Sequence, residues 1–416
     1  MNYMKELKCL VCGRSYDPKQ IDYTCPSCGP EGNLSVIYDY EMLRKSWQKE
    51  DLLTNKDYTI WRYLPLLPIQ NPIFIPPGMV GATPLYHFPP LAEKYGCADL
   101  AFKDEGRNPT ASLKDRPSSL AVVKAQEKNA SVVTCASTGN AASSLSCACA
   151  SVGLACVIFV PERTPKAKLA QLLVYGARVI MVKGSYDQAF DLCLKASERF
   201  GWYSRNTGYN PYMREGKKTF ALELCEQLNW TAPDKVFVSV GDGNTLSGGW
   251  KGFTELYHLG WIDKLPQMIA VQAEGSSPIV KAFRDNGNPE PMEANTIADS
   301  IAVGRPRDGM AALKAIRESQ GDALSVSDSE ILDSLKLLAR ETGIFAEPSA
   351  AAAYAGFLKY AREGNLSTEE KVSVIISGSG LKDIEGAMKS VSETPLLLSP
   401  DEKELDKLEG LDLNPS

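Results

Sequence analysis

The sequence predicts an α/β protein with two domains, in which parallel sheets are covered by helices, and a small amino-terminal ribbon ahead of them. Two observations predict this class. From Asp99 onward, short β-branched or apolar runs alternate with segments of helical periodicity, and the amino-terminal segment repeats a CxxC pair. A chain of 416 residues, 44% of them hydrophobic, is long enough to bury the cores of two or three domains.

The composition argues against several classes of protein. Lys and Arg total 45 against 51 acidic residues, so the basic bias that favours nucleic-acid binding is absent. No stretch reaches the roughly 20 apolar residues that cross a bilayer. The amino terminus, MNYMKELKC, has no apolar signal core, so we expect a cytoplasmic protein with neither membrane nor nucleic-acid partners. His87 and His258 lie in no motif, which leaves little for a Ser-His-Asp hydrolase.

Eleven cysteines are too dilute in a chain of this length for a disulfide scaffold. Seven fall in apolar segments, where we expect small buried side chains: Cys97, Cys135, Cys147, Cys149, Cys156, Cys193 and Cys225. The other four form two CxxC pairs, each followed by glycine and separated by twelve residues: Cys9 with Cys12, and Cys25 with Cys28.

The two CxxC pairs predict a structural zinc ribbon over residues 1–38. Each pair can form a tight knuckle, and two knuckles close a tetrahedron of thiolates around the metal. The alternative is a ribbon that has lost its metal and keeps four reduced thiols. A redox CxxC fits less well because no βαβ pattern surrounds the pairs.

After the ribbon we expect a helix over residues 41–49 and a wrapping linker with prolines at positions 65, 68, 72, 76 and 77. The run Gly81-Ala82-Thr83-Pro84-Leu85 opens the main body, and we assign it an architectural role. Strands are expected at residues 100–103, 132–135, 155–160, 178–182, 235–240, 267–273 and 372–376. Helices are expected after Lys114, from Asn140, after Pro165, from Tyr186, and over residues 246–258, 329–342 and 349–362.

Lys114 is the candidate nucleophile. It stands in the stretch NPTASLKDR, residues 108–116, where a turn leads into a helix and the neighbouring side chains are small. A lysine in such a place can lose solvation and attack an aldehyde. The alternative is a solvated surface lysine at a helix amino terminus.

A glycine-bearing turn follows the expected strand at residues 235–240. Gly241, Asp242, Gly243, Asn244 and Thr245 stand between that strand and a helical segment, an arrangement that converges N–H donors on a phosphate. No Gly-Lys-Ser/Thr follows, so this is not a Walker loop, and it does not match GxGxxG. A plain strand-helix connector is the alternative.

The stretches NPTASLKDR, ASTGN, VSVGDGNTLSGGWKGF and SGSGLKD resemble, in order and spacing, the signature of the second fold type of pyridoxal-phosphate enzymes. This type is similar to the tryptophan synthase β subunit, and the closest resemblance is to threonine synthases, over roughly residues 80–389. The resemblance implies a large cofactor-binding domain of residues 39–136 and 216–393, a small inserted domain of residues 137–215, and a homodimer. Residues 394–416 form an acidic polar tail, in which we expect a frayed helix or disorder.

The resemblance also implies roles for single residues. Lys114 would bind the cofactor's aldehyde covalently, the turn of residues 241–245 its phosphate, and Asn140 its 3′-oxygen, although Asn is also a common helix cap. Ser377 would face the ring nitrogen; this neutral partner favours elimination and replacement over transamination, and a helix cap is again the alternative. Ser137, Thr138 and Gly139 would donate to the substrate carboxylate.

The segment at residues 206–219 departs from the family pattern. It resembles the family's NPYRLEG, whose arginine binds the substrate phosphate, but Met213 stands at that place. Arg214 is one helical step, about 100°, further on. The candidate substrate residues here are Asn206, Arg214 and Lys217, with Lys218 as another cation; Ala141 and Ser379 also differ from the usual residues.

The resemblance implies a lyase that converts O-phospho-L-homoserine and water to L-threonine and phosphate. Because of the departures, a related β-replacement or β-elimination enzyme, similar to cysteate synthase or to a serine/threonine deaminase, is an alternative. Its substrate would be a phosphorylated or other acidic amino acid, or serine or threonine. An alternative from another functional class is a zinc-ribbon scaffold protein whose main body no longer catalyses a reaction.

Overall fold

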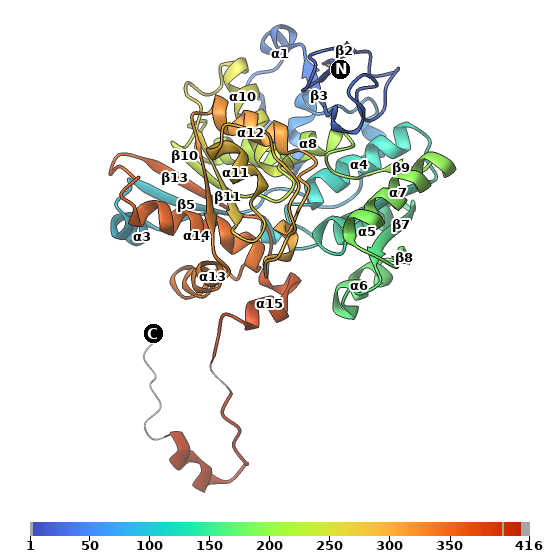
Figure 1. Ribbon diagram of the computed structural model, residues 1–416. Helices are drawn as coiled ribbons and strands as arrows, with labels where there is room; N and C mark the ends of the chain where they lie inside the picture. The colour runs from blue at the N-terminus through green and yellow to red at the C-terminus, as the bar shows by residue number, and fades with distance from the viewer. Residues whose placement is uncertain (1–2, 393–394, 409–416) are drawn as a thin grey trace.

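The computed structural model describes residues 3–392 and 395–408 (Figure 1). Within these residues the strands form three sheets: a three-stranded sheet in the order β2-β1-β3, a six-stranded sheet in the order β12-β11-β10-β13-β5-β4, and a four-stranded sheet in the order β8-β7-β6-β9. Helices cover both larger sheets. The expected α/β class with parallel sheets and an amino-terminal ribbon is confirmed.

The amino-terminal ribbon packs on the main body. Its antiparallel sheet consists of β1 (Met4–Cys9), β2 (Ser15–Tyr16) and β3 (Leu34–Tyr38). The side chains of Leu7, Val36 and Tyr38 are buried in the same apolar cluster as the main body. The ribbon is therefore continuous with the core and does not stand as a separate module.

The segment after the ribbon wraps along the body as expected. It contains α1 (Tyr40–Ser46), α2 (Asp51–Thr54) and the 3-10 helices η2 (Ile60–Leu66) and η3 (Pro72–Phe74). Helix α1 ends before the expected position because Trp47 is extended and packs on Trp261, with ring centroids 4.5 Å apart.

The six-stranded sheet is parallel except for β4, which is antiparallel to β5. Its strands are β4 (Leu85–His87), β5 (Asp99–Asp104), β10 (Lys235–Ser239), β11 (Gln267–Ala273), β12 (Asp322–Val326) and β13 (Lys371–Ile376). Both faces are buried because side chains alternate along each strand: Met268 joins one apolar cluster and Ile269 the other. One face carries α3 (Pro89–Tyr95), α13 (Asp328–Thr342) and α14 (Pro348–Arg362); the other carries α10 (Asn244–Leu259), α11 (Pro278–Arg284) and α12 (Gly309–Glu318).

The four-stranded sheet is parallel and consists of β6 (Val132–Ala136), β7 (Ala155–Pro161), β8 (Arg178–Val182) and β9 (Tyr203–Ser204). Helices α5 (Asn140–Val152) and α6 (Lys166–Val174) lie on one face and α7 (Tyr186–Phe200) on the other. Helix α4 (Asp115–Glu127) packs against both α5 and α8 (Tyr212–Lys217) and so joins the two larger sheets. Strand β6 belongs to this sheet although it precedes residue 137, the expected domain border, so the division into domains stays a prediction.

The remaining elements are α9 (Thr219–Gln227), α15 (Ile384–Met388), η1 (Gly29–Glu31), η4 (Glu105–Arg107), η5 (Asp299–Ile301), η6 (Gly380–Lys382) and η7 (Glu402–Leu408). Of the expected tail, residues 394 and 409–416 lie outside the described residues; η7 stands away from the body (Figure 1).

All seven expected strands form, but within the two larger sheets the sequence did not predict β4, β9 and β12. Six of the seven cysteines expected to be buried are buried; Cys147 is only half-buried, which corrects that expectation. In the described part of the chain, no helix has the length and apolar character that a membrane span requires.

Candidate active site

The turn of residues 108–116 holds Lys114 at the start of α4. Asn108 donates from Nδ2 to Oε2 of Glu105 at 2.9 Å, and Asp115 accepts from the N–H and the hydroxyl of Thr110, both at 2.8 Å. Ala111 takes a left-handed conformation with φ of 63°. The polar neighbours of Lys114 therefore fix the turn, while the lysine itself lines a cavity.

A buried ion-pair network anchors the same turn from below. Arg116, which is fully buried, donates to both carboxylate oxygens of Glu105 at 2.6 and 2.7 Å and to Glu223 at 3.0 Å. The hydroxyl of Thr83 donates to Glu105 at 2.8 Å and to Glu223 at 3.1 Å. The run at residues 81–85 thus has the architectural place that the sequence suggested, and it braces the start of α4.

Two backbone hydrogen bonds bring the carboxyl end of β13 to Lys114. The N–H of Leu113 donates to the carbonyl of Ser377 at 2.9 Å, and the N–H of Ser379 donates to the carbonyl of Ala111 at 3.0 Å. The hydroxyl of Ser377 lies 3.4 Å from that of Ser239 at the end of β10. The carboxyl ends of two strands therefore meet beside the lysine.

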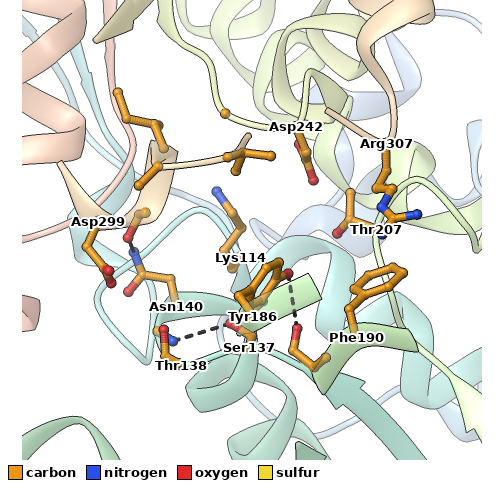
Figure 2. A pocket seen from close by; sticks show the side chains of 18 of the residues that line it. Lys114, Ser137, Thr138, Asn140, Tyr186, Phe190, Thr207, Asp242, Asp299 and Arg307 are labelled. Carbon is orange, nitrogen blue, oxygen red and sulfur yellow. Dashed lines mark hydrogen bonds between the residues drawn. The ribbon is translucent and has the colours of Figure 1, made fainter. Parts of the chain in front are cut away.

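The cavity around Lys114 has a volume of about 290 Å³ and lies between the two larger sheets. Figure 2 shows Lys114 pointing into its middle, with Asn140 to one side and Asp242 to the other. Of the predicted site residues, these line it: Lys114, Ser137, Thr138, Gly139, Asn140, Asn206, Gly241, Asp242, Thr245 and Ser377. Gly243, Asn244, Arg214 and Lys217 are not among the lining residues.

The charge of Lys114 depends on its surroundings. Burial lowers the pKa of its amine, and the carboxylates of Asp242 and Glu347 oppose this shift. A lowered pKa raises the fraction of neutral amine, which is the form that attacks an aldehyde and accepts a proton.

The turn of residues 241–245 leads into α10 and has the geometry of an anion site. Gly243 has φ of 96°, and a Cβ there would lie 2.7 Å from the carbonyl oxygen of Asp308, so only glycine fits. Asn244 donates its N–H to Asp242 Oδ1 at 3.0 Å, while no acceptor among the described residues takes the N–H groups of Gly241, Gly243 or Thr245. These free donors lie at the amino-terminal end of α10, where the helix dipole is positive and also favours an anion.

Asp242 places a carboxylate in this turn. Burial opposes its ionisation, yet the neighbouring Lys217, Lys114 and Arg205 lower its pKa, so the group is charged. The single carboxylate of Asp242 is thus outnumbered by the basic side chains of Lys217, Lys114 and Arg205. The electrostatic surroundings of the turn therefore still favour a bound anion.

Asn140 begins α5 and donates from Nδ2 to Oε1 of Glu347 at 2.7 Å. Its Oδ1 is buried without a hydrogen-bond partner among the described residues. Burial raises the pKa of Glu347 to about 7, against the opposing effects of Lys114 and Lys382. A buried polar atom without a partner at the cavity wall indicates a place for a polar ligand.

The candidate substrate residues have different surroundings. Asn206 lines the cavity, but its side chain accepts from the N–H of Ala136 at 2.9 Å and donates to Ser204 at 3.1 Å. Arg214 is buried in an ion pair with Asp308, away from the lysine cavity. Burial lowers the pKa of the fully enclosed Lys217 to about 7.

Sequence reasoning missed several residues of the cavity wall: Tyr186, Arg205, Thr207, Ser239, Ser300 and Arg307. It also missed Glu347, which contacts Asn140 from the start of α14. Arg205 offered one signal, since it stands directly before Asn206 in a segment already singled out.

The four ribbon cysteines converge as the CxxC pattern indicates. Their sulfur atoms all lie within 4.8 Å of one another, and those of Cys12 and Cys25 are 3.7 Å apart. A zinc–sulfur distance of about 2.3 Å in a tetrahedron gives a sulfur–sulfur distance of about 3.8 Å. Gly13 and Gly29, which follow the pairs, both have positive φ and close the two knuckles. The donor set and geometry fit zinc.

Two largely parallel sheets, a buried lysine between them, and a glycine turn at a helix amino terminus are the features of a pyridoxal-phosphate-dependent enzyme. The residues present fit that cofactor: Lys114 can bind its aldehyde, the free N–H groups at residues 241–245 its phosphate, and Asn140 and Ser377 line the space for its ring.

Comparison with known proteins agrees with this class. The model of the family described as "Pyridoxal-phosphate dependent enzyme" matches residues 77–378. The threonine synthase of Methanocaldococcus jannaschii is 42% identical over 96% of this chain and 98% of that protein. The threonine synthase of Methanosarcina acetivorans is 40% identical over 91% of this chain and 93% of that protein. The chain belongs to the pyridoxal-phosphate-dependent enzymes and, among them, to the threonine synthase family.

Solved structures share the fold. The processed threonine deaminase isoform 2 of Solanum lycopersicum has a TM-score of 0.63 at 22% identity and covers 74% of this chain and 87% of its own. Diaminopropionate ammonia lyase of Escherichia coli has a TM-score of 0.65 at 19% identity, with the same coverage of 74% and 87%. At these identities the likeness extends to the fold alone.

Proposed function

We propose that this enzyme is a threonine synthase, which converts O-phospho-L-homoserine and water to L-threonine and phosphate. The observation that carries the proposal is the 42% identity to a threonine synthase across nearly the whole of both chains. The cavity supports it, because it combines a buried amine with donors for anions on opposite sides.

The bound pyridoxal ring supplies an electron sink for negative charge on carbons next to the substrate amine. Lys114 has two tasks: it holds the cofactor between turnovers, and its amine then takes and returns protons at the substrate carbons. The lowered pKa of Lys114 suits the second task, because it raises the fraction of neutral amine that can accept a proton.

The residues around the lysine position the reactants. Ser137, Thr138 and Gly139 stand at the start of α5, where their donors suit the substrate carboxylate. The turn of residues 241–245 would hold the cofactor phosphate. Asn140, fixed by Glu347, and Ser377, beside Ser239, would orient the ring.

One observation favours a second candidate, an enzyme of β-replacement or β-elimination similar to cysteate synthase or to a serine/threonine deaminase. Met213 is fully buried where the family carries an arginine, and Arg214 is occupied by Asp308. A different acidic amino acid, or serine or threonine, could then be the substrate.

Product analysis on the purified holoenzyme separates the candidates. Incubation with O-phospho-L-homoserine should release phosphate and threonine in equal amounts. Incubations with phosphoserine plus sulfite, and with serine or threonine alone, should give no product. Cysteate or ammonia as the main product would replace the proposal with the second candidate, and a protein that binds no cofactor would favour the scaffold.

We also propose that Cys9, Cys12, Cys25 and Cys28 hold one structural zinc ion, which their convergence supports. The homodimer and the cytoplasmic location stay predictions.

A further inference from the structure

One basic side chain of the cavity stands out by its surroundings. Arg205 follows β9, is 1% exposed and lines the cavity around Lys114. Its backbone N–H donates to the carbonyl of Thr134 at 2.8 Å, so the residue continues the sheet and its position is fixed.

Neutral hydroxyl groups pin the guanidinium of Arg205 but leave part of it free. Nε donates to the hydroxyl of Ser118 at 3.1 Å and Nη1 donates to that of Thr207 at 2.9 Å. Nη2 is buried without a hydrogen-bond partner in the described part of the chain. A guanidinium carries five N–H donors, so at least the two on Nη2 remain for a ligand.

Arg205 also differs from the other arginines of the cavity in having no carboxylate in ion-pair contact among the described residues. Arg305 pairs with Glu31 at 2.6 Å, and Arg307 lies 3.6 Å from both Asp187 and Asp191. The carboxylate of Asp242 acts on Arg205 only from a distance and is shared with Lys114 and Lys217. A buried, always-charged guanidinium without an ion pair in direct contact favours the binding of an anion. The free Nη2 is therefore an anion site that this chain leaves open.

The alternative cations nearby are already occupied or enclosed. Arg214 is held by Asp308 and by Ser247, whose hydroxyl accepts from Nε at 3.1 Å. Lys217 does not line the cavity, and the opposite charge that acts most strongly on it is that of Asp242, in the turn assigned to the cofactor phosphate. Among the arginines that line the cavity in the described part of the chain, Arg205 alone combines burial with a guanidinium nitrogen that has no hydrogen-bond partner.

We propose that Arg205 anchors the phosphate monoester of the substrate through its free Nη2, with Lys217 balancing the charge of Asp242 behind it. This inference rests on the proposed function, in which the substrate is a phosphorylated amino acid. A planar guanidinium suits a phosphate because it can donate two parallel hydrogen bonds to two oxygens. Arg205 would thus take the part that the family assigns to the position of Met213.

The test compares Arg205→Gln and Arg205→Lys with a matched control, Arg199→Gln. Arg199 is an exposed arginine of helix α7, which packs on the four-stranded sheet that also holds Arg205 in place. Three quantities are measured on each holoenzyme: KM and kcat for O-phospho-L-homoserine, the dissociation constant of inorganic phosphate by calorimetry, and the affinity for pyridoxal phosphate by visible absorbance. A charged hydrogen bond is worth about 1.5–3 kcal/mol, which corresponds to a change of roughly 10- to 150-fold.

In Arg205→Gln we expect KM and the phosphate dissociation constant to rise within that range, with the cofactor affinity unchanged. Arg205→Lys should recover part of the phosphate affinity because it keeps the charge without the planar fork. If only the cofactor affinity falls, Arg205 serves the cofactor phosphate and the inference is wrong. Equal values in Arg205→Gln and Arg199→Gln would also overturn it.

The calorimetric arm needs no turnover, so it separates this inference from the proposed function. If the wild type binds phosphate through Arg205 but makes no threonine, the anion site stands and the reaction must be sought among other phosphorylated amino acids. If Arg205→Gln does not fold, as judged by circular dichroism, the comparison of Arg205→Lys with the wild type decides, and unchanged phosphate affinity there would overturn the inference.

Discussion

The side-chain amide of Asn33 donates a hydrogen bond of 2.9 Å to Oδ1 of Asp308, which joins the ribbon to the catalytic body. Asn33 also donates to the carbonyl of Arg307 at 2.7 Å. The other oxygen of Asp308 accepts from Asn244 at 2.8 Å and from Ser247 at 2.7 Å. The ribbon thus contacts the carboxylate of Asp308, which also holds the glycine turn and the start of α10 in place.

Asn33→Ala should weaken cofactor binding although Asn33 does not line the cavity. The substitution removes one buried and one partly buried hydrogen bond, so the free energy of unfolding should fall by about 1–3 kcal/mol and the affinity for pyridoxal phosphate several-fold. Urea unfolding and cofactor titration measure the two effects. The control is Asn365→Ala, an exposed asparagine whose side chain bonds only to Glu363 in the described region. Equal cofactor affinity in both variants would show that the ribbon contact is structural only.

Zinc should be present at one ion per chain, and removing it should loosen the ribbon. A Cβ on Gly32 would lie 2.6 Å from the Cβ of Cys25, so the second knuckle directly sets the position of Asn33. We expect Cys28→Ser to lose the metal and to lower the thermal midpoint, whereas Cys147→Ser, outside the cluster, should keep both. Elemental analysis and thermal unfolding check this, and a metal-free wild type purified without chelators would contradict it.

Lys114→Ala should abolish turnover, because it removes the amine that binds the cofactor and moves protons. Reduction of the holoenzyme with borohydride, followed by peptide mapping, should place the label on Lys114. Lys195→Ala, which changes an exposed lysine on α7, serves as the control. A label on another lysine, or full activity of Lys114→Ala, would refute the assignment.

Glu347 should make stability depend on pH. Burial raises its pKa from 4.5 to about 7, and the groups that face it are Lys114, Lys382, Asn140 and Asp383. The folded protein therefore binds more protons between these pH values than the unfolded chain, so the stabilising contribution is complete below pH 4.5 and is lost as the pH rises through 7.

Relative to Glu347→Gln, the cofactor-free wild type should lose up to about 3 kcal/mol of unfolding free energy over that interval, at about 1.4 kcal/mol per pKa unit. Urea titrations at several pH values between 4.5 and 7.5 measure the difference, with wild type and variant in the same buffers. Parallel curves for the two proteins would mean that Glu347 is already ionised when buried.

The sequence predicted the features that local patterns encode. Strand β11 was placed at its observed bounds because six of its seven residues are buried and most of them are apolar. Strand β8 was also placed at its observed bounds, because its run of Val, Ile, Met and Val is apolar although its side chains are exposed or half-buried at the edge of the sheet. The lysine turn was predicted because its partners are nearby: Thr110 meets Asp115 five residues later. Strand β12, Asp322–Val326, carries polar residues at two of its five positions and gave too weak a signal.

Other parts of the site depend on contacts that a single sequence does not reveal. Glu347 meets Asn140 across more than two hundred residues. The interest of Arg205 lies in its unpaired Nη2, which only the three-dimensional structure reveals. Arg214 was predicted to bind the substrate because nothing in the sequence shows that it forms an ion pair with Asp308. Patterns of residue type can nominate a cation, but the three-dimensional neighbours decide whether its charge is free.

Strand β13 has a consequence for how the protein is made. It is the last strand of the described chain, yet it lies between β10 and β5 in the six-stranded sheet. Until β13 is synthesised, strands β12-β11-β10 and strands β5-β4 form two separate part-sheets. Each part-sheet has an unpaired edge strand that can pair with another chain and cause aggregation. A truncated chain that ends before Lys371 lacks the strand that joins the two part-sheets, and it also lacks Ser377 beside the lysine turn. We therefore expect premature termination to abolish both solubility and catalytic activity.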